Sequence, residues 1–366
     1  MTSKTSPKVL ISGGGTGGHI YPAIAIADEI KRRLPNAEIL FVGADSKMEM
    51  EKVPKAGYAI KGLPIAGFDR SNMKANLRFP FKVIKSVSLA KKIYNEFKPD
   101  IAVGTGGYAS GPMLWIAGKN NVPYLLQEQN SFPGVTNKIL KNKAAAICTA
   151  YQNIVQFPAE KVHYTGNPIR SEIFTNLPSK EEAIKIFKLD PSKPTILSVG
   201  GSQGSRAVNN AWLENLDELV ASGVQLIWQT GKLDFPKIND LVGNKYPTIH
   251  VTEFIYNMQD AYAASDMIVS RAGAMAISEL SIIGKPTILL PLPSAAEDHQ
   301  TKNAMALVDK EAAILVKDID AKQTLVKEVI ALANNEELKN KLSNNIRAFG
   351  KPNATKEIVD ILLNLL

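Results

Sequence analysis

The stretch ISGGGTGGHI, residues 11–20, combines closely spaced glycines with a threonine and a histidine. A short apolar run, residues 8–11, precedes it, and apolar residues recur at helical spacing over residues 20–34. The glycines therefore lie where a buried strand turns into a helix, and the N–H groups of such a turn bind anions. His19 stands at the helix start, where the dipole lowers an imidazole pKa and favours a neutral ring. We interpret His19 as a candidate general base, with turn capping as the alternative.

A second turn of this kind is GGSQGS, residues 200–205. Its N–H groups and the hydroxyls of Ser202 and Ser205 suit a diphosphate, although a serine here also caps helices. A third is RAGAMAISEL, residues 271–280, where Gly273 lets a ligand approach a helix start. Glu279 lies about one and a half turns into that helix, where it can accept both ribose hydroxyls of a nucleotide or simply face solvent.

Further polar residues follow other strand-like runs. GTGGYASGP, residues 104–112, and QEQNSFPG, residues 127–134, are expected at the carboxyl ends of strands, where open α/β sheets bind ligands. Glu128 and Asn130 in the second stretch indicate either capping or chemistry. Gln300, in LPSAAEDHQTKNA, is placed to bond sugar hydroxyls, with capping by neighbouring acids as the alternative.

Strand-like and helix-like runs alternate through most of the 366 residues, which predicts doubly wound parallel sheets. The pattern restarts after residues 164–180, and the two halves share glycine turns at matching places. We therefore predict an α/β protein of two Rossmann-like domains facing across a cleft, residues 1–165 and 166–349. The final segment, about 350–366, has an apolar face that we expect to pack back on the first domain.

Composition limits the possible partners. The net charge of +8 favours an anionic one: nucleic acid, a phosphorylated substrate or an anionic lipid surface. One cysteine excludes an internal disulfide, and four scattered histidines offer no zinc set. Asp318–Asp320 has the Asp-x-Asp pattern of some metal sites, but an N-cap at Asp320 fits its position better. We expect neither a signal peptide nor a membrane span.

Residues 72–92 mix large apolar and basic side chains, which is typical of helices that rest on anionic lipid. An amphipathic helix with its apolar face in the core is the alternative. The candidate membrane contacts are Leu77, Phe79, Phe81, Lys82, Ile84 and Lys85.

A dinucleotide-dependent oxidoreductase is the competing interpretation of the first turn. Gly13, Gly15 and Gly18 satisfy G-x-G-x-x-G, and Asp45 is a slightly late candidate for the acidic ribose ligand. The repeated glycine turns and the RAGAMAISEL helix argue against it.

The ordered set GGGTGGHIYPAIAIA, GTGGYASGP, EQNSFPGVTNK, TGNPIR, GGSQGS, EFIYNM and RAGAMAISEL resembles the bacterial peptidoglycan N-acetylglucosaminyltransferases, from about residue 8 to at least residue 350. The resemblance implies a B-type glycosyltransferase fold. It implies an inverting transfer from UDP-N-acetylglucosamine to the 4-hydroxyl of the muramyl sugar of undecaprenyl-pyrophosphoryl-MurNAc-pentapeptide, which turns lipid I into lipid II. It further implies no cofactor, no metal ion and no nucleic acid.

The family also implies a peripheral enzyme on the cytoplasmic face of the plasma (inner) membrane, with an anionic membrane surface and cell-wall synthesis proteins as partners. Another B-type transferase with a different acceptor and a non-catalytic membrane-associated scaffold stay open as alternatives.

Matching motifs carry the family's roles onto this sequence. His19 is the candidate base, with Glu128 as a second candidate or an acceptor contact. The implied donor contacts are Thr16, Gly17, Gly18, Asn130, Arg170, Ser202, Ile255, Ala274, Met275, Glu279 and Gln300. The implied acceptor contacts are Gly14, Gly15, Gly106, Gly107 and Tyr108.

Overall fold

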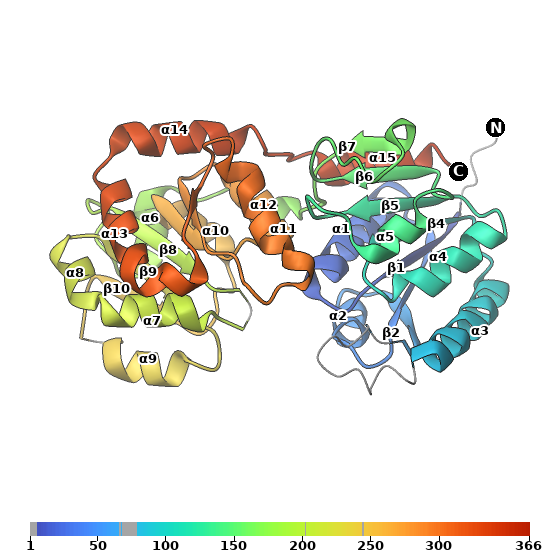
Figure 1. Cartoon of the computed structure of the whole chain (residues 1–366), viewed down its shortest axis with the longest axis horizontal. Coiled ribbons are helices and arrows are strands. Elements are labelled where there is room, and N and C mark those ends of the chain that lie inside the picture. Colours follow the sequence, from blue (N-terminus) through green and yellow to red (C-terminus); the bar gives the residue numbers. More distant parts are fainter. Residues whose placement is uncertain (1–5, 66, 68–78, 202, 244) are drawn as a thin grey trace. The chain divides into compact units, whose positions relative to one another are not determined.

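The computed structural model describes residues 6–65, 67, 79–201, 203–243 and 245–366 (Figure 1). The chain divides into two compact units. Unit 1 comprises residues 1–170 and 351–366, and unit 2 comprises residues 171–350. The boundaries predicted from the sequence lie at residues 165 and 349.

Unit 1 is built on a parallel sheet with strand order β3-β2-β1-β4-β5-β6-β7. Its strands are β1 (Lys8–Gly13), β2 (Glu38–Ala44), β3 (Ala59–Leu63), β4 (Ile101–Gly106), β5 (Tyr124–Glu128), β6 (Ala146–Thr149) and β7 (Val162–Tyr164). The order reverses between β1 and β4, and ligands bind outside the carboxyl ends of strands at such a switch point. The first glycine turn follows β1, so it lies at that point.

Helices cover both faces of this sheet. They are α1 (Gly17–Arg33), α2 (Glu49–Lys55), α3 (Phe79–Phe97), α4 (Ser110–Lys119), α5 (Val135–Leu140) and α15 (Ala354–Leu363). Side chains of α1, α2 and α15 share one hydrophobic core with the sheet, and side chains of α3, α4 and α5 share the other. These apolar faces explain why the helical segments fold against the strands, since burial of apolar surface drives packing.

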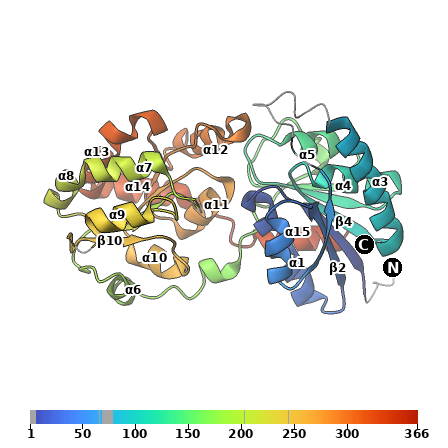
Figure 2. The same ribbon diagram turned by 90° about the horizontal axis from the view of Figure 1, so that it is seen from below.

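The C-terminal helix α15 lies beside α1, as Figure 2 shows. Ile358, Val359 and Leu362 are fully buried in the α1 core. Arg33 ties the two helices together: its guanidinium pairs with Asp360, and its Nη2 donates to the Lys356 carbonyl at 2.9 Å. The last residues of the chain therefore belong to unit 1.

Unit 2 has a parallel sheet of order β10-β9-β8-β11-β12-β13, with its switch point between β8 and β11. The strands are β8 (Thr195–Val199), β9 (Gln225–Gln229), β10 (Ile249–Thr252), β11 (Met267–Ser270), β12 (Thr287–Leu289) and β13 (Ile314–Leu315). The helices are α6 (Lys180–Ile186), α7 (Arg206–Glu214), α8 (Leu216–Ala221), α9 (Phe235–Val242), α10 (Met258–Ala264), α11 (Ala274–Ile283), α12 (His299–Val308), α13 (Ala321–Ala333) and α14 (Glu336–Arg347).

Two doubly wound parallel α/β units confirm the predicted fold class. The strands β3, β7 and β13 were not predicted. All three lie at sheet edges. β3 and β7 have mixed side chains, whereas β13 is a two-residue strand within the apolar run of residues 312–316. Among the described helices, none combines the length and apolar character that crossing a membrane requires.

Candidate functional site

His19 lies in the first turn of α1, directly after the glycine loop. Its backbone N–H donates to the Thr16 carbonyl at 3.1 Å. Its ring Nδ1 lies 3.2 Å from both the Gly14 carbonyl oxygen and the Thr16 Oγ1. From β4, the Thr105 hydroxyl donates to the His19 carbonyl at 2.8 Å. Contacts from the loop after β1 and from β4, the two strands at the switch point, therefore fix the start of α1 and the His19 imidazole.

The loop after β4 closes around the same imidazole. Gly106 and Gly107 have φ of 90° and 76°, a conformation that glycine adopts without strain. A Cβ on Gly106 would lie 3.1 Å from His19 Cδ2, and one on Gly107 would lie 2.1 Å from the Gly14 oxygen. The ring of Tyr108 packs against Gly15, whose Cβ would lie 3.1 Å from it. The structure therefore brings the five predicted acceptor residues together with His19.

Glu128 ends β5 with a side chain that is only 1% exposed. Its Oε1 accepts from the N–H and the Nδ2 of Asn130 at 3.1 and 3.3 Å. Its Oε2 accepts from the Gly134 N–H at 3.1 Å and from Asn137 Nδ2 at 2.8 Å. Burial raises the pKa of Glu128, and these donors oppose the rise. A carboxylate engaged in this way holds the loop of residues 129–134 in place.

Asn137 of α5 lies beside the predicted residues and was not among them. Its Nδ2 reaches Glu128 and also lies 3.6 Å from the position of a Cβ on Gly106, the point that His19 contacts. Its Oδ1 is buried and has no hydrogen-bond partner among the described residues. Asn137 lies in the quoted stretch EQNSFPGVTNK, which was the available signal.

Glu49 is a second missed residue. It begins α2 and is 0% exposed, and its Oε1 accepts from the N–H groups of Gly15 and Ala44 at 3.1 and 2.9 Å. The anion that the Gly15 N–H contacts is therefore one of the protein's own side chains. Nothing in the sequence around Glu49 marks it, because it lies outside the glycine motif.

In unit 2, Gly201 and Gly204 pack on the end of β9. Gln229 Nε2 donates to the Gly201 carbonyl at 2.9 Å, and a Cβ on Gly204 would lie 2.0 Å from the Thr230 oxygen. Ser205 caps α7, since its Oγ accepts from the Val208 N–H at 3.3 Å. Ser202 lies outside the described residues.

The start of α11 is open on its outer side. Gly273 is the N-cap, and nothing lies within 4 Å of a Cβ built on it. Ala274 and Met275 follow as the first helical residues, with Glu279 further along. The Tyr262 hydroxyl donates to Glu279 Oε2 at 3.2 Å. Burial and the Glu279 charge raise the pKa of Tyr262, so this phenol stays protonated and donates.

The other predicted donor contacts follow different elements. Ile255 is buried after β10, between the exposed rings of Phe254 and Tyr256. Gln300 is the second residue of α12, and its Oε1 accepts from the Leu292 N–H at 2.9 Å. Arg170 is exposed, and it is the last residue of the first segment of unit 1, residues 1–170.

The side chains of the Asp-x-Asp stretch, residues 318–320, lie within unit 2 and contact its own residues. Asp318 pairs with Arg271, which also donates to the Leu290 and Pro291 carbonyls at 3.1 and 3.2 Å. Asp320 occupies the N-cap position of α13 without a side-chain capping bond. Within the described ranges, no three or more His, Cys, Asp or Glu side chains are grouped so that they could hold a metal ion.

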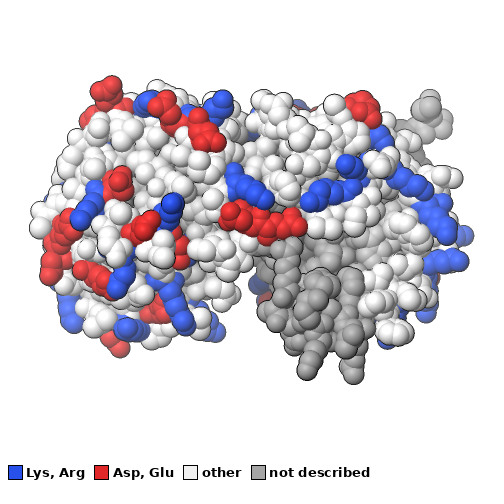
Figure 3. All heavy atoms as spheres, viewed as in Figure 1, with Lys and Arg blue, Asp and Glu red and all other residues white. Residues whose placement is uncertain are grey.

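Helix α3 presents both apolar and basic side chains to the outside. Phe81 and Ile84 are 74% and 67% exposed, beside exposed Lys82 and Lys85. The neighbouring α4 adds Trp115, 47% exposed, with Lys119 Nζ 5.2 Å from its ring centroid. Figure 3 shows Lys and Arg side chains along the edge of unit 1 where Figure 1 draws α3 and α4. Leu77 and the Phe79 side chain lie outside the described residues.

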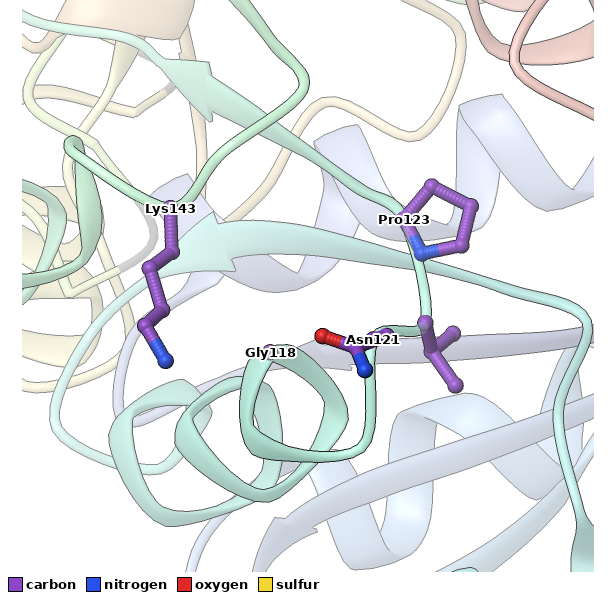
Figure 4. A pocket seen from close by; sticks show the side chains of 5 residues that line it. Gly118, Asn121, Pro123 and Lys143 are labelled. Carbon is purple, nitrogen blue, oxygen red and sulfur yellow. The ribbon is translucent and has the colours of Figure 1, made fainter.

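A pocket of about 300 Å³ is lined by Gly118, Asn121, Val122, Pro123 and Lys143 (Figure 4). These residues precede β5 and β6 in the chain, so the pocket lies at the amino edge of the sheet. The glycine loops lie at the carboxyl edge, and the pocket therefore contains none of the predicted site residues.

Residues 9–149 match the glycosyltransferase family 28 N-terminal domain, and residues 195–359 match the family 28 C-terminal domain. The chain belongs to glycosyltransferase family 28. Family membership confirms the predicted enzyme class and sets aside the dinucleotide-dependent oxidoreductase that Gly13, Gly15 and Gly18 suggested.

Individual relatives of this family 28 chain match 93% or more of its length. A relative from Cytophaga hutchinsonii, named UDP-N-acetylglucosamine–N-acetylmuramyl-(pentapeptide) pyrophosphoryl-undecaprenol N-acetylglucosamine transferase, is 51% identical over 100% of this chain and 99% of its own. A relative of the same name from Phocaeicola vulgatus is 53% identical over 93% of this chain and 91% of its own. The crystal structure of Acinetobacter baumannii MurG matches with a TM-score of 0.79 and 28% identity, covering 98% of this chain and 99% of that one.

Proposed function

We propose that this enzyme transfers N-acetylglucosamine from UDP-N-acetylglucosamine to the 4-hydroxyl of the muramyl sugar of undecaprenyl-pyrophosphoryl-MurNAc-pentapeptide. The product is lipid II, the disaccharide precursor of peptidoglycan. The observation that carries this proposal is the 51% identity over the whole chain with a relative whose name states the transfer.

The two units take different substrates in this proposal. Unit 1 binds the lipid-linked acceptor, and its contacts are Gly14, Gly15, Gly106, Gly107 and Tyr108. The packing of these residues around His19 supports the assignment. Unit 2 binds the UDP-sugar at the switch point of its own sheet.

The reaction needs a base at the acceptor hydroxyl. His19 removes the proton from the 4-hydroxyl as that oxygen bonds to the anomeric carbon of the donor. The bond from the anomeric carbon to the diphosphate oxygen breaks, and its electron pair leaves with UDP. Attack from the face opposite the leaving group inverts the anomeric configuration. Glu128 has no part in this proton transfer, because its oxygens hold Asn130, Gly134 and Asn137.

Donor recognition follows the loops at the carboxyl ends of the strands. The backbone of Ile255 recognises uracil, Glu279 the ribose hydroxyls, and Gln300 the hydroxyls of the transferred sugar. Thr16, Gly17, Gly18 and Asn130 of unit 1 contact the donor sugar and phosphate region. Support comes from the open start of α11 and from the orientation of Glu279 by Tyr262.

The leaving diphosphate is stabilised without a metal ion or other cofactor in this proposal. Ser202, Arg170 and the N–H groups at Ala274 and Met275 neutralise its negative charge, and a helix start supplies such donors already oriented. The unobstructed outer side of Gly273 supports an anion at this place.

The exposed face formed by Phe81, Lys82, Ile84, Lys85 and Trp115 places unit 1 against anionic lipid in this proposal. Apolar side chains enter the interface while lysines meet lipid phosphates. The enzyme is then a peripheral protein on the cytoplasmic face of the plasma (inner) membrane, where a lipid-linked acceptor is found and where other cell-wall synthesis proteins are candidate partners.

The test is acceptor-dependent release of UDP from UDP-N-acetylglucosamine, with a short-chain lipid-linked muramyl-pentapeptide and excess EDTA. Release supports the transfer and its metal independence together. Release only after magnesium or manganese is added would overturn the metal-free mechanism. No release under either condition would overturn the proposed acceptor, and the α- or β-configuration of the product would decide inversion.

A further inference from the structure

A single peptide group connects the buried carboxylate of Glu49 to the imidazole of His19. The N–H of Gly15 donates to Glu49 Oε1 and Oε2 at 3.1 and 3.2 Å. The carbonyl of the same peptide group, on Gly14, lies 3.2 Å from His19 Nδ1. In a trans peptide the N–H and C=O point in opposite directions, and no cis peptide occurs in the described chain. When the N–H faces the carboxylate, the carbonyl therefore faces the imidazole.

The loop is built around this carboxylate. Glu49 is 0% exposed, and a buried carboxylate is tolerated only when hydrogen bonds replace its hydration. A Cβ on Gly14 would lie 2.1 Å from Glu49 Oε1, and a Cβ on Gly43 would lie 2.6 Å from Glu49 Cγ. Glycine at both places is what allows the carboxylate to reach the Gly15 N–H.

The contact with Gly14 selects one tautomer of His19. A carbonyl oxygen only accepts, so Nδ1 must carry a hydrogen to bond it, and the Thr16 hydroxyl oxygen can accept from the same side. The lone pair of the neutral ring is then on Nε2. Nε2 lies 3.4 Å from the position of a Cβ on Gly106, on the side where Asn137 also converges.

We propose that Glu49 is a positioning residue that, through the Gly14–Gly15 peptide group, holds His19 in the Nδ1–H tautomer and strengthens Nε2 as a base. The proposal deepens the function given above, because it rests on His19 as the base. Hydrogen bonds in a chain polarise one another, so the carboxylate makes the Gly14 carbonyl a better acceptor. A carboxylate that bonds histidine directly performs the same task in Ser-His-Asp triads.

Other groups beside the loop do not replace Glu49 in this role. Tyr108 packs against Gly15. Burial, and to a smaller extent the Glu49 charge, raises the pKa of Tyr108, which keeps the phenol neutral. Among the described residues, Glu128 reaches this region through the amide of Asn137. Glu49 is thus the carboxylate whose hydrogen bond fixes the peptide group that His19 contacts.

The first test is the tautomer of His19 by ¹⁵N NMR of histidine-labelled protein. The chain has four histidines, so the His19 signals are identified by their loss in His19→Gln. We expect wild-type His19, when neutral, to carry its hydrogen on Nδ1. A hydrogen on Nε2 would overturn the proposal without reference to any further variant or to activity.

The second test is Glu49→Gln, which keeps the shape and one accepting oxygen but removes the charge. Loss of the Glu49 charge destabilises the imidazolium form of His19, so the pKa of its imidazole should fall. The Gly14 carbonyl becomes a weaker acceptor for Nδ1–H, so both neutral tautomers should be populated. We expect kcat to drop by about tenfold to a hundredfold, part of what a general base contributes, while the donor KM changes less than about twofold. The low-pH limb of kcat should move to lower pH.

Glu51→Gln is the matched control, because Glu51 lies on the same helix with an exposed side chain paired to Lys55 at 2.8 Å. It should match wild type in NMR and in kcat. A Glu49→Gln protein with the wild-type tautomer and imidazole pKa would contradict the proposal. If wild-type His19 shows the expected tautomer but no UDP is released, the proposed function fails while the positioning of His19 stands.

Discussion

The replacement Glu128→Gln separates a structural carboxylate from a catalytic one. Glu128 accepts four hydrogen bonds, two on each oxygen. Whichever way the new amide is turned, its NH₂ faces two donors that previously had an acceptor. One pair belongs to Asn130, and the other comes from the Gly134 N–H and Asn137.

The energetic cost follows from that count. A buried donor left without its acceptor costs about 1–3 kcal/mol, and side-chain amides relieve part of the loss by rotating. We therefore expect Glu128→Gln to destabilise unit 1 by about 2–4 kcal/mol, summed over two donors. For a domain of this size each kcal/mol lowers Tm by about 2–4 °C, which gives a fall of roughly 5–15 °C. Differential scanning calorimetry of wild type, Glu128→Gln and the exposed control Glu160→Gln measures it.

The pH dependence gives a second signature. Because burial raises the folded-state pKa of Glu128 above the usual 4.5, the folded protein binds this proton more tightly than the unfolded chain. Wild type should therefore gain stability relative to Glu128→Gln as the pH falls through the folded-state pKa toward 4.5, and lose that gain as the pH rises.

Kinetics complete the test. Displacement of Asn130 and Asn137 should lower kcat/KM by about tenfold or more, since small misplacements are costly in active sites. The low-pH limb of the rate should persist, because His19 is the proposed base. An unchanged Tm would refute the hydrogen-bond count, and disappearance of that limb in the folded variant would identify Glu128 itself as the base.

Three further predictions concern other elements. Tyr262→Phe removes the donor to Glu279 and should raise the KM for UDP-N-acetylglucosamine by about threefold to tenfold, as expected for a hydrogen bond to a charged group, with kcat nearly unchanged. Initial-rate kinetics measure both constants, and an unchanged KM would contradict a role of Glu279 in ribose binding. The double variant Phe81→Ser, Ile84→Ser should bind anionic liposomes more weakly while turnover of a soluble acceptor is retained. Undiminished sedimentation with liposomes would exclude this face as the membrane contact. Burial raises the pKa of Cys148 to about 12, so its thiol should resist iodoacetamide at pH 8 in the native protein and react only on unfolding; rapid native labelling, followed by mass spectrometry, would contradict that burial.

The sequence predicted the fold class because its signals are local and repeated. Strands β1, β4, β8 and β11 are each a short apolar run followed by a glycine turn and a helix, as in KVLIS before residues 13–18. The edge strands β3 and β7 lack that signal, since one or both of their faces meet solvent and their side chains are mixed. Their pairing with β2 and β6 is a long-range contact that no local pattern records.

Site residues were predictable where the backbone conformation restricts the residue type. Gly106 and Gly107, both at positive φ, are of this kind. Glu49 and Tyr262 were not predictable, because their hydrogen bonds to Gly15 and Glu279 join residues that are distant in sequence. An isolated glutamate or tyrosine on a helix carries no sign of such a contact.

The glycine loop itself has a more specific explanation than the one its sequence suggested. The pattern indicated N–H groups exposed to an anion, yet most of these glycines provide space for side chains of other elements. A Cβ on Gly13 would meet Thr105, one on Gly14 would meet Glu49, and one on Gly15 would meet Tyr108. Thr105 and Glu49 then bond the backbone on either side of His19, at its carbonyl and at the Gly15 N–H. Any substitution at Gly13 or Gly14 should therefore act on His19 first, through displaced neighbours, and only then on an anion bound at the helix start.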